Sequence, residues 1–226
     1  MPNNNSDIEE IVHDLKTPIT SIIGFVELLQ KGGQDSKTVN EFYDIIASES
    51  KRLLNLVNNM PNLSGKVPAK NSESCNLSVE IKKFVKELEP LADKRKIQID
   101  IKVNSEEIYV SIPENKIARI ITNIVENAIK YNKESGQIFI NVTEKSNLAY
   151  IKIKDTGIGI AEDEIDKVFE KHYRADSGKK MNAEGSGLGL AIAKDIAESY
   201  GGNIKVSSKL GESTEFIISF PISRIS

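Results

Sequence analysis

The sequence predicts an α+β fold: an antiparallel helical hairpin forming a dimeric four-helix bundle, followed by an α/β sandwich whose mixed sheet carries helices on one face. Three observations support this prediction. Apolar residues recur at helical spacing over residues 6–59. Residues 61–75, "PNLSGKVPAKNSESC", have the Pro-, Gly- and Ser-rich composition of a connecting segment. Beyond residue 76, segments that alternate apolar and polar residues lie between amphipathic helical segments.

The first 60 residues are expected to form two helices. Ser6 and Glu9 have the spacing of a capping box, so the first helix should begin near Asp7. Its apolar positions follow at intervals of three and four residues, and the paired glycines of "KGGQDS" should end it. The second helix has its own apolar stripe from Val39 onward and should stop before Pro61.

A hairpin of this length has too little core to be stable alone. Pairing two copies around a two-fold axis buries both apolar stripes in a four-helix bundle, so we expect a homodimer. The chain is then divided into a dimerisation domain at residues 1–64, a linker at 65–75 and an α/β domain at 76–226.

The α/β domain should contain four helices and six strands. The helices are predicted at residues 79–96, 113–132, 162–171 and 187–200, the second of them opened by Pro113 as a first-turn residue. The strands are predicted at residues 97–103, 108–112, 136–145, 149–155, 203–208 and 215–222.

Composition excludes several classes of protein. The net charge is −3 and the 30 Lys and Arg residues are scattered, so nucleic acid is not an expected partner. No apolar run approaches the ~18 residues of a spanning helix, and there is no signal-peptide pattern. We therefore expect no membrane contact within this chain and a cytoplasmic location, either alone or as the cytosolic part of a membrane-anchored protein. One cysteine and two distant histidines provide neither a disulfide nor a zinc site.

The helix predicted at residues 113–132 places four polar residues on one face. Asn123, Asn127, Lys130 and Tyr131 are spaced at i, i+4, i+7 and i+8, opposite an apolar face. This can be an ordinary solvated face. The residue types favour a ligand site instead, because an amide oxygen suits Mg²⁺, a lysine suits phosphate and a tyrosine ring suits a base.

Two glycine-rich segments flank the later helices. In "DTGIGI", Asp155 ends a predicted strand and can accept a hydrogen bond from an exocyclic amine, while Gly157 and Gly159 permit close backbone approach; a plain turn is the alternative. In "EGSGLGLAIA", glycines precede a helix whose first N–H groups can bind an anion. Neither segment fits the dinucleotide fingerprint, because Glu162 and Ile192 occupy the third glycine position, and no P-loop is present.

Five motifs occur in a fixed order along residues 7–222. They are "HDLKTPITSIIGF", the Asn-bearing helix, "DTGIGI", "VFEKHYRAD" and "GSGLGLAIA". Together they resemble the sensor histidine kinases of two-component systems, whose ATP-binding domain is shared with Hsp90-type chaperones and type II topoisomerases. The sequence departs from the family pattern at Lys16, at Pro61 and at His172, where an aromatic residue is usual.

The resemblance implies roles for residues of the first motif. His13 would be the phosphoacceptor, Asp14 would orient its ring and help to take its proton, and Thr17 would serve in removing phosphate from the partner. A neutral imidazole nitrogen can attack a phosphoryl group, and a carboxylate beside it stabilises the cation that forms. Pro18 lacks the N–H that would bond the carbonyl one turn earlier, so the helix should bend next to His13.

The resemblance also implies a nucleotide site that uses ATP and Mg²⁺. Asn127 would ligate the metal with support from Asn123, Lys130 would contact phosphate, and Tyr131 would lie near the nucleoside. Asp155 would bind the adenine amine. The polar stretch at residues 175–184 is expected to form a lid over the pocket. The residues expected to shape the pocket, contact the phosphates or hold this lid are Gly157, Gly159, Arg174, Gly185, Gly187, Leu188 and Gly189.

The predicted function is therefore that of an ATP-dependent protein-histidine kinase. It would autophosphorylate His13 and pass the phosphoryl group to an aspartate of a response-regulator receiver domain, with phosphatase activity toward that regulator as an additional expectation. The receiver domain would dock near Ile22, Ile23 and Val26. Input would come from a separate sensor protein or from a sensor segment outside this chain. The alternatives are an ATP-binding module without histidine kinase activity and a partner-binding scaffold.

Overall fold

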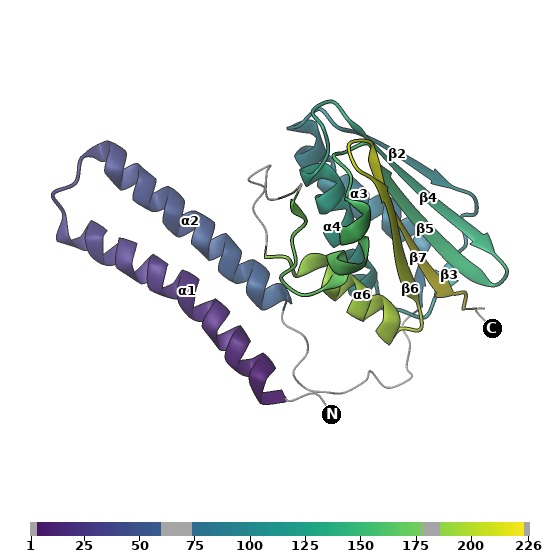
Figure 1. The fold of residues 1–226 in the computed structure, drawn as a ribbon, viewed down its shortest axis with the longest axis horizontal. Helices are drawn as coiled ribbons and strands as arrows, with labels where there is room; N and C mark the ends of the chain where they lie inside the picture. Colours follow the sequence, from purple (N-terminus) through teal and green to yellow (C-terminus); the bar gives the residue numbers. More distant parts are fainter. Residues whose placement is uncertain (1–3, 60–73, 177, 179–185, 224–226) are drawn as a thin grey trace. The chain divides into compact units, whose positions relative to one another are not determined.

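The computed structural model describes residues 4–59, 74–176, 178 and 186–223 (Figure 1). The chain divides into two compact units, Met1–Gly65 and Lys66–Ser226, here the first and second unit. Most of the linker predicted at residues 65–75 lies outside the described residues, and so does Pro61. No helix among the described residues is long and apolar enough to cross a membrane.

The first unit is the predicted helical hairpin, formed by α1 (Asn4–Lys31) and α2 (Ser36–Asn59). The start predicted for α1 is wrong, because α1 begins at Asn4 and Ser6 lies inside the helix instead of capping it. The chain reverses at Gly32 and Gly33, both with positive φ. The rings of Phe25 and Phe42 pack between the helices with their centroids 5.1 Å apart.

The second unit contains the predicted mixed sheet. Five strands lie in the order β2-β4-β5-β7-β6; β2 and β4 are parallel, and the other neighbours are antiparallel. Their bounds are β2 (Gln98–Val103), β4 (Gln137–Lys145), β5 (Leu148–Asp155), β6 (Asn203–Lys209) and β7 (Ser213–Pro221).

Helices cover one face of this sheet, as Figure 1 shows. They are α3 (Leu77–Asp93), α4 (Glu114–Lys130) and α6 (Gly189–Ser199). Alternate strand residues, such as Ile140, Ile151 and Ile218, point into the core between the two layers and are fully buried. The fold class predicted from the sequence is confirmed for the hairpin and for the α/β sandwich.

Three local features differ from the prediction. Cys75, assigned to the linker, is buried and forms β1 (Cys75–Asn76), which pairs with β3 (Tyr109–Val110). The short helix predicted at residues 162–171 is present as a 3₁₀ helix, η1, which ends two residues earlier than predicted (Glu162–Phe169). Pro113 is the N-cap of α4 with an extended backbone and not a residue of its first turn.

Candidate functional site

Helix α4 separates its apolar and polar residues as predicted. Its buried face consists of Ile117, Ile120, Ile121, Ile124, Val125, Ala128 and Ile129. On the opposite face Asn123, Asn127, Lys130 and Tyr131 are half-buried. Lys130 Nζ lies 4.8 Å from the ring centroid of Tyr131. The Nδ2 atom of Asn123 is buried and has no hydrogen-bond partner among the described residues, so this face holds a polar group that a ligand or water can satisfy.

Asp155 ends β5 with its carboxyl group buried. Oδ1 accepts a hydrogen bond from the Gly157 N–H at 2.8 Å. Burial raises the pKa of Asp155 to about 6, against the opposing effect of backbone hydrogen bonds from Gly157 and Thr214. The carboxyl group is therefore ionised at neutral pH and can accept a further hydrogen bond, as the adenine amine requires.

The two glycines after Asp155 are needed for close backbone contacts. A Cβ on Gly157 would lie 2.4 Å from the carbonyl oxygen of Tyr131, which is also bonded by the Ile158 N–H at 3.1 Å. Gly159 has a φ of +66° and faces the backbone of Lys209. The end of β5 is thus packed directly against the turn that follows α4.

The segment after η1, which contains Arg174, is bonded to η1 on both sides of that residue. The Oε1 atom of buried Glu164 accepts hydrogen bonds from the Tyr173 hydroxyl at 2.8 Å and from the Asp176 N–H at 2.9 Å. The bond to Glu164 raises the pKa of Tyr173 to about 12. Both contacts flank Arg174, so its backbone is held on either side.

The glycines before α6 bring that helix to α4 and to the segment around His172. Gly187 has a φ of +72°, and a Cβ there would lie 2.7 Å from the His172 carbonyl carbon, while the His172 N–H bonds the Gly187 carbonyl at 3.1 Å. A Cβ on Gly189 would lie 3.0 Å from Asn123 Oδ1. Leu188 is the N-cap of α6. Gly185 lies outside the described residues, as does most of the predicted lid.

The structure thus brings most of the predicted nucleotide residues to one side of α4. Sequence reasoning missed Glu164 and Thr214, both buried polar residues. Neither position carries a local signal, because each acts through contacts with residues of other elements. Among the described residues, no three His, Cys, Asp or Glu side chains form a group that could hold a metal ion.

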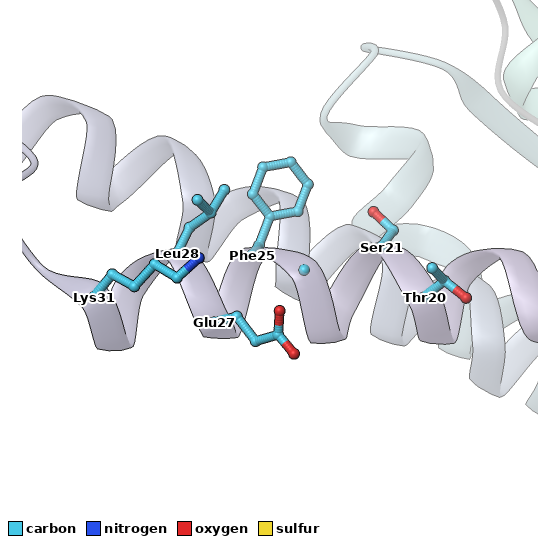
Figure 2. A pocket seen from close by; sticks show the side chains of 7 residues that line it. Thr20, Ser21, Phe25, Glu27, Leu28 and Lys31 are labelled. Carbon is cyan, nitrogen blue, oxygen red and sulfur yellow. The ribbon is translucent and has the colours of Figure 1, made fainter.

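The predicted acceptor residues lie on α1. His13 and Asp14 fall in its N-terminal half, and Thr17 is exposed one turn after His13. Pro18 is buried within the same helix. Beyond it, α1 carries a shallow hollow, drawn in Figure 2, that is lined by Thr20, Ser21, Gly24, Phe25, Glu27, Leu28 and Lys31.

Comparisons with known proteins agree with both units. The family model "Histidine kinase-, DNA gyrase B-, and HSP90-like ATPase" matches residues 112–224, and the model "His Kinase A (phospho-acceptor) domain" matches residues 8–64. The sensor histidine kinase WalK of Bacillus subtilis is 31% identical over 220 residues, which are 95% of this chain and 36% of WalK. The sensor protein SrrB of Staphylococcus aureus is 34% identical over 228 residues, with 95% of this chain and 37% of SrrB covered.

Solved structures show the same fold. The Acinetobacter baumannii histidine kinase AdeS superposes with a TM-score of 0.71 at 24% identity, covering 94% of this chain and 98% of AdeS. The histidine kinase ThkA, solved in complex with the response regulator protein TrrA, gives a TM-score of 0.72 at 24% identity, covering 96% of this chain and 61% of that one.

The second unit therefore belongs to the ATPase family shared by histidine kinases, DNA gyrase B and HSP90. With its phospho-acceptor hairpin, the chain is a member of the sensor histidine kinases of two-component systems. It spans little more than a third of the length of the curated relatives WalK and SrrB.

Proposed function

We propose that this chain is an ATP-dependent protein-histidine kinase that transfers the γ-phosphoryl group of ATP to His13. The observation that carries the proposal is that one chain combines a phospho-acceptor hairpin with an ATPase domain whose Asp155 carboxyl is buried beside α4. Catalysis would consist mainly of positioning and charge neutralisation, as in other phosphoryl transfers.

Each predicted side chain has a distinct task at the nucleotide. Asp155 accepts a hydrogen bond from the adenine amine. Gly157 has no side chain, so the backbone at this position can lie close to the bound base. Lys130 and Arg174 offset phosphate charge. On α1, Asp14 selects the imidazole tautomer of His13 that leaves the attacking nitrogen unprotonated.

The donor set of α4 fits a magnesium ion. Asn127 presents a half-buried amide on the same face as the unpartnered Nδ2 of Asn123. A magnesium ion takes few protein ligands and completes its octahedral shell with phosphate oxygens and water, which suits a single amide oxygen. When bound, the ion would neutralise the charge of the phosphates.

We further propose that the phosphoryl group passes to an aspartate of a response-regulator receiver domain. Exposed apolar side chains on α1, Ile23 and Val26, would contact the receiver domain. ThkA, which has the same fold, is solved with a response regulator, and this supports the proposal. Thr17 would assist the reverse removal of phosphate from the regulator. A homodimer through the hairpin would cover the remaining apolar surface of both helices.

Labelling with γ-labelled ATP tests the kinase. The nucleotide and magnesium are incubated with the native chain and with the variants His13→Gln and Asn127→Ala. The label bound to each protein is then tested for stability in alkali and in acid. Alkali-stable, acid-labile label on the native chain and on neither variant is expected. Label that persists in His13→Gln would mean another acceptor. ATP binding without any label would favour a binding module or scaffold.

A further inference from the structure

Arg95, in the turn between α3 and β2, holds the end of α4 from outside the predicted nucleotide site. Its Nη1 atom donates to the carbonyl oxygens of Ile129 and Lys130, both at 2.5 Å, and Nη2 donates to the Asn132 carbonyl at 3.0 Å. The carbonyl of Arg95 accepts a bond from the Ser135 N–H at 3.2 Å. A single residue therefore makes four hydrogen bonds, two to the last two residues of α4 and two to the segment that follows it.

The end of α4 gains from such a partner, although the Asn132 N–H already donates to the Ile129 carbonyl at 3.3 Å. The last carbonyl groups of a helix have no intrahelical donor, and a glycine in the left-handed conformation commonly closes the turn. Here the C-cap is Tyr131 with a φ of −96°, so the helix has no left-handed cap at that position. The planar guanidinium of Arg95 reaches several oxygens at once, and its positive charge suits a helix C-terminus.

The same turn connects the two halves of the nucleotide site. The fully buried Asn132 donates through Nδ2 to the Gln137 carbonyl at 3.1 Å and accepts through Oδ1 from the Thr156 hydroxyl at 3.2 Å. Thr156 directly follows Asp155. Arg95 thus bonds the backbone of the turn after α4, and the Asn132 side chain in the same turn bonds Thr156 at the end of β5.

We propose that Arg95 is a positioning residue that sets the separation between the polar face of α4 and the Asp155 carboxylate. It acts through the backbone of residues 129–132. The proposal rests on the proposed binding of ATP. It predicts that Arg95 affects both the affinity for the nucleotide and the preference for adenine over guanine. The Asp155 carboxylate accepts a hydrogen bond from the adenine amine but repels the carbonyl oxygen that guanine has at the same ring position.

Isothermal titration calorimetry of the full chain with ADP and GDP tests this role. Arg95→Gln should bind ADP about tenfold more weakly, equivalent to about 1.4 kcal/mol, and its preference for ADP over GDP should fall. Arg95→Lys should lie between Gln and native, because one ammonium group cannot bond three carbonyls in the fork geometry of arginine. In autophosphorylation, the KM for ATP should rise more than the rate at saturating ATP falls.

Two controls separate positioning from general stability. Lys94→Gln removes an exposed neighbouring charge and should leave the affinity for ADP unchanged. Val142→Ala removes buried methyl groups from β4, away from the turn, and should lower stability while ADP affinity below the unfolding transition stays native.

The outcomes distinguish this inference from the proposed function. A native chain that binds no ADP would overturn the nucleotide site itself. A native chain that binds ADP, with equal affinity and equal base preference in Arg95→Gln, would overturn the role of Arg95. Equal losses in Arg95→Gln and Val142→Ala would show that only stability changed and would also overturn it. If Arg95→Gln does not fold, Arg95→Lys tests the inference instead: a lower preference for ADP over GDP supports the role of Arg95, and a native preference overturns it.

Discussion

Asp155→Asn should make the second unit more stable at neutral pH while weakening its binding of ATP. The pKa of the buried carboxyl group is about 6 in the folded chain against 3.8 as the ordinary value. Because the folded state holds this proton more tightly than the unfolded chain, the stability that protonation contributes is fully present below pH 3.8. It is lost as the pH rises through about 6.

The magnitude follows from the size of this shift. At about 1.4 kcal/mol per pKa unit, ionisation of Asp155 costs the folded state roughly 3 kcal/mol at pH 7.5. An amide of the same shape avoids this cost but leaves one oxygen for the two backbone donors Gly157 and Thr214, so a net gain of about 1–2 kcal/mol is expected. For a unit of this size, the unfolding temperature should rise by about 2–4 °C per kcal/mol.

Binding should change in the opposite direction. The amide nitrogen would face the adenine amine, so a charge-assisted hydrogen bond worth about 1.5–3 kcal/mol would become a contact between two donors. ATP affinity should therefore fall by roughly tenfold to more than a hundredfold.

Thermal unfolding between pH 4 and pH 7.5, with and without ATP, checks both effects. The stability difference between Asp155→Asn and native should narrow as the pH falls toward 4, and ATP should stabilise only the native chain strongly. Asp100→Asn, on the exposed side of β2, is the control and should match the native chain. A variant that is less stable at pH 7.5, or that keeps the native pH dependence, would refute the reasoning.

Three further substitutions, two within the second unit and one within the first, test other parts of the account. Gly157→Ala should abolish ATP binding in calorimetry while circular dichroism stays native, because the added methyl group would lie 2.4 Å from the Tyr131 carbonyl oxygen. Asn132→Ala should lower the free energy of unfolding by about 1–3 kcal/mol, because buried partners of its amide lose their bonds, and a denaturant titration measures this. Pro18→Ala should stabilise the hairpin by about 1–3 kcal/mol and slow autophosphorylation by removing the predicted bend; an equal or faster rate of labelling would contradict this.

Features with a local signal were predictable from the sequence. The two faces of α4 follow from the period of the helix, and the place of Asp155 follows from a strand that ends in a glycine-rich turn. The capping box at Ser6 is also a local signal, yet α1 continues through it to Asn4.

Features that depend on distant contacts were not predictable. Cys75 forms a strand only because it pairs with Val110, 35 positions later. Arg95 looks like one more surface charge in "ADKRKIQ", since its partners lie 34 to 37 residues away. Glu164 is similar, because the contacts that bury its carboxylate come from the segment beyond η1. Sequence patterns therefore miss the polar residues that do not line the site themselves but hold the segments that do.

Tandem mass spectrometry under alkaline conditions tests the central claim most directly, by locating the phosphoryl group after the native chain has reacted with ATP and magnesium. The proposed kinase predicts a single phosphoryl group on the peptide that contains His13, formed more slowly by Asp155→Asn at ATP concentrations that just saturate the native chain and lost after brief exposure to acid. A phosphoryl group on any other residue, or a chain that binds ATP and remains unmodified, would contradict it.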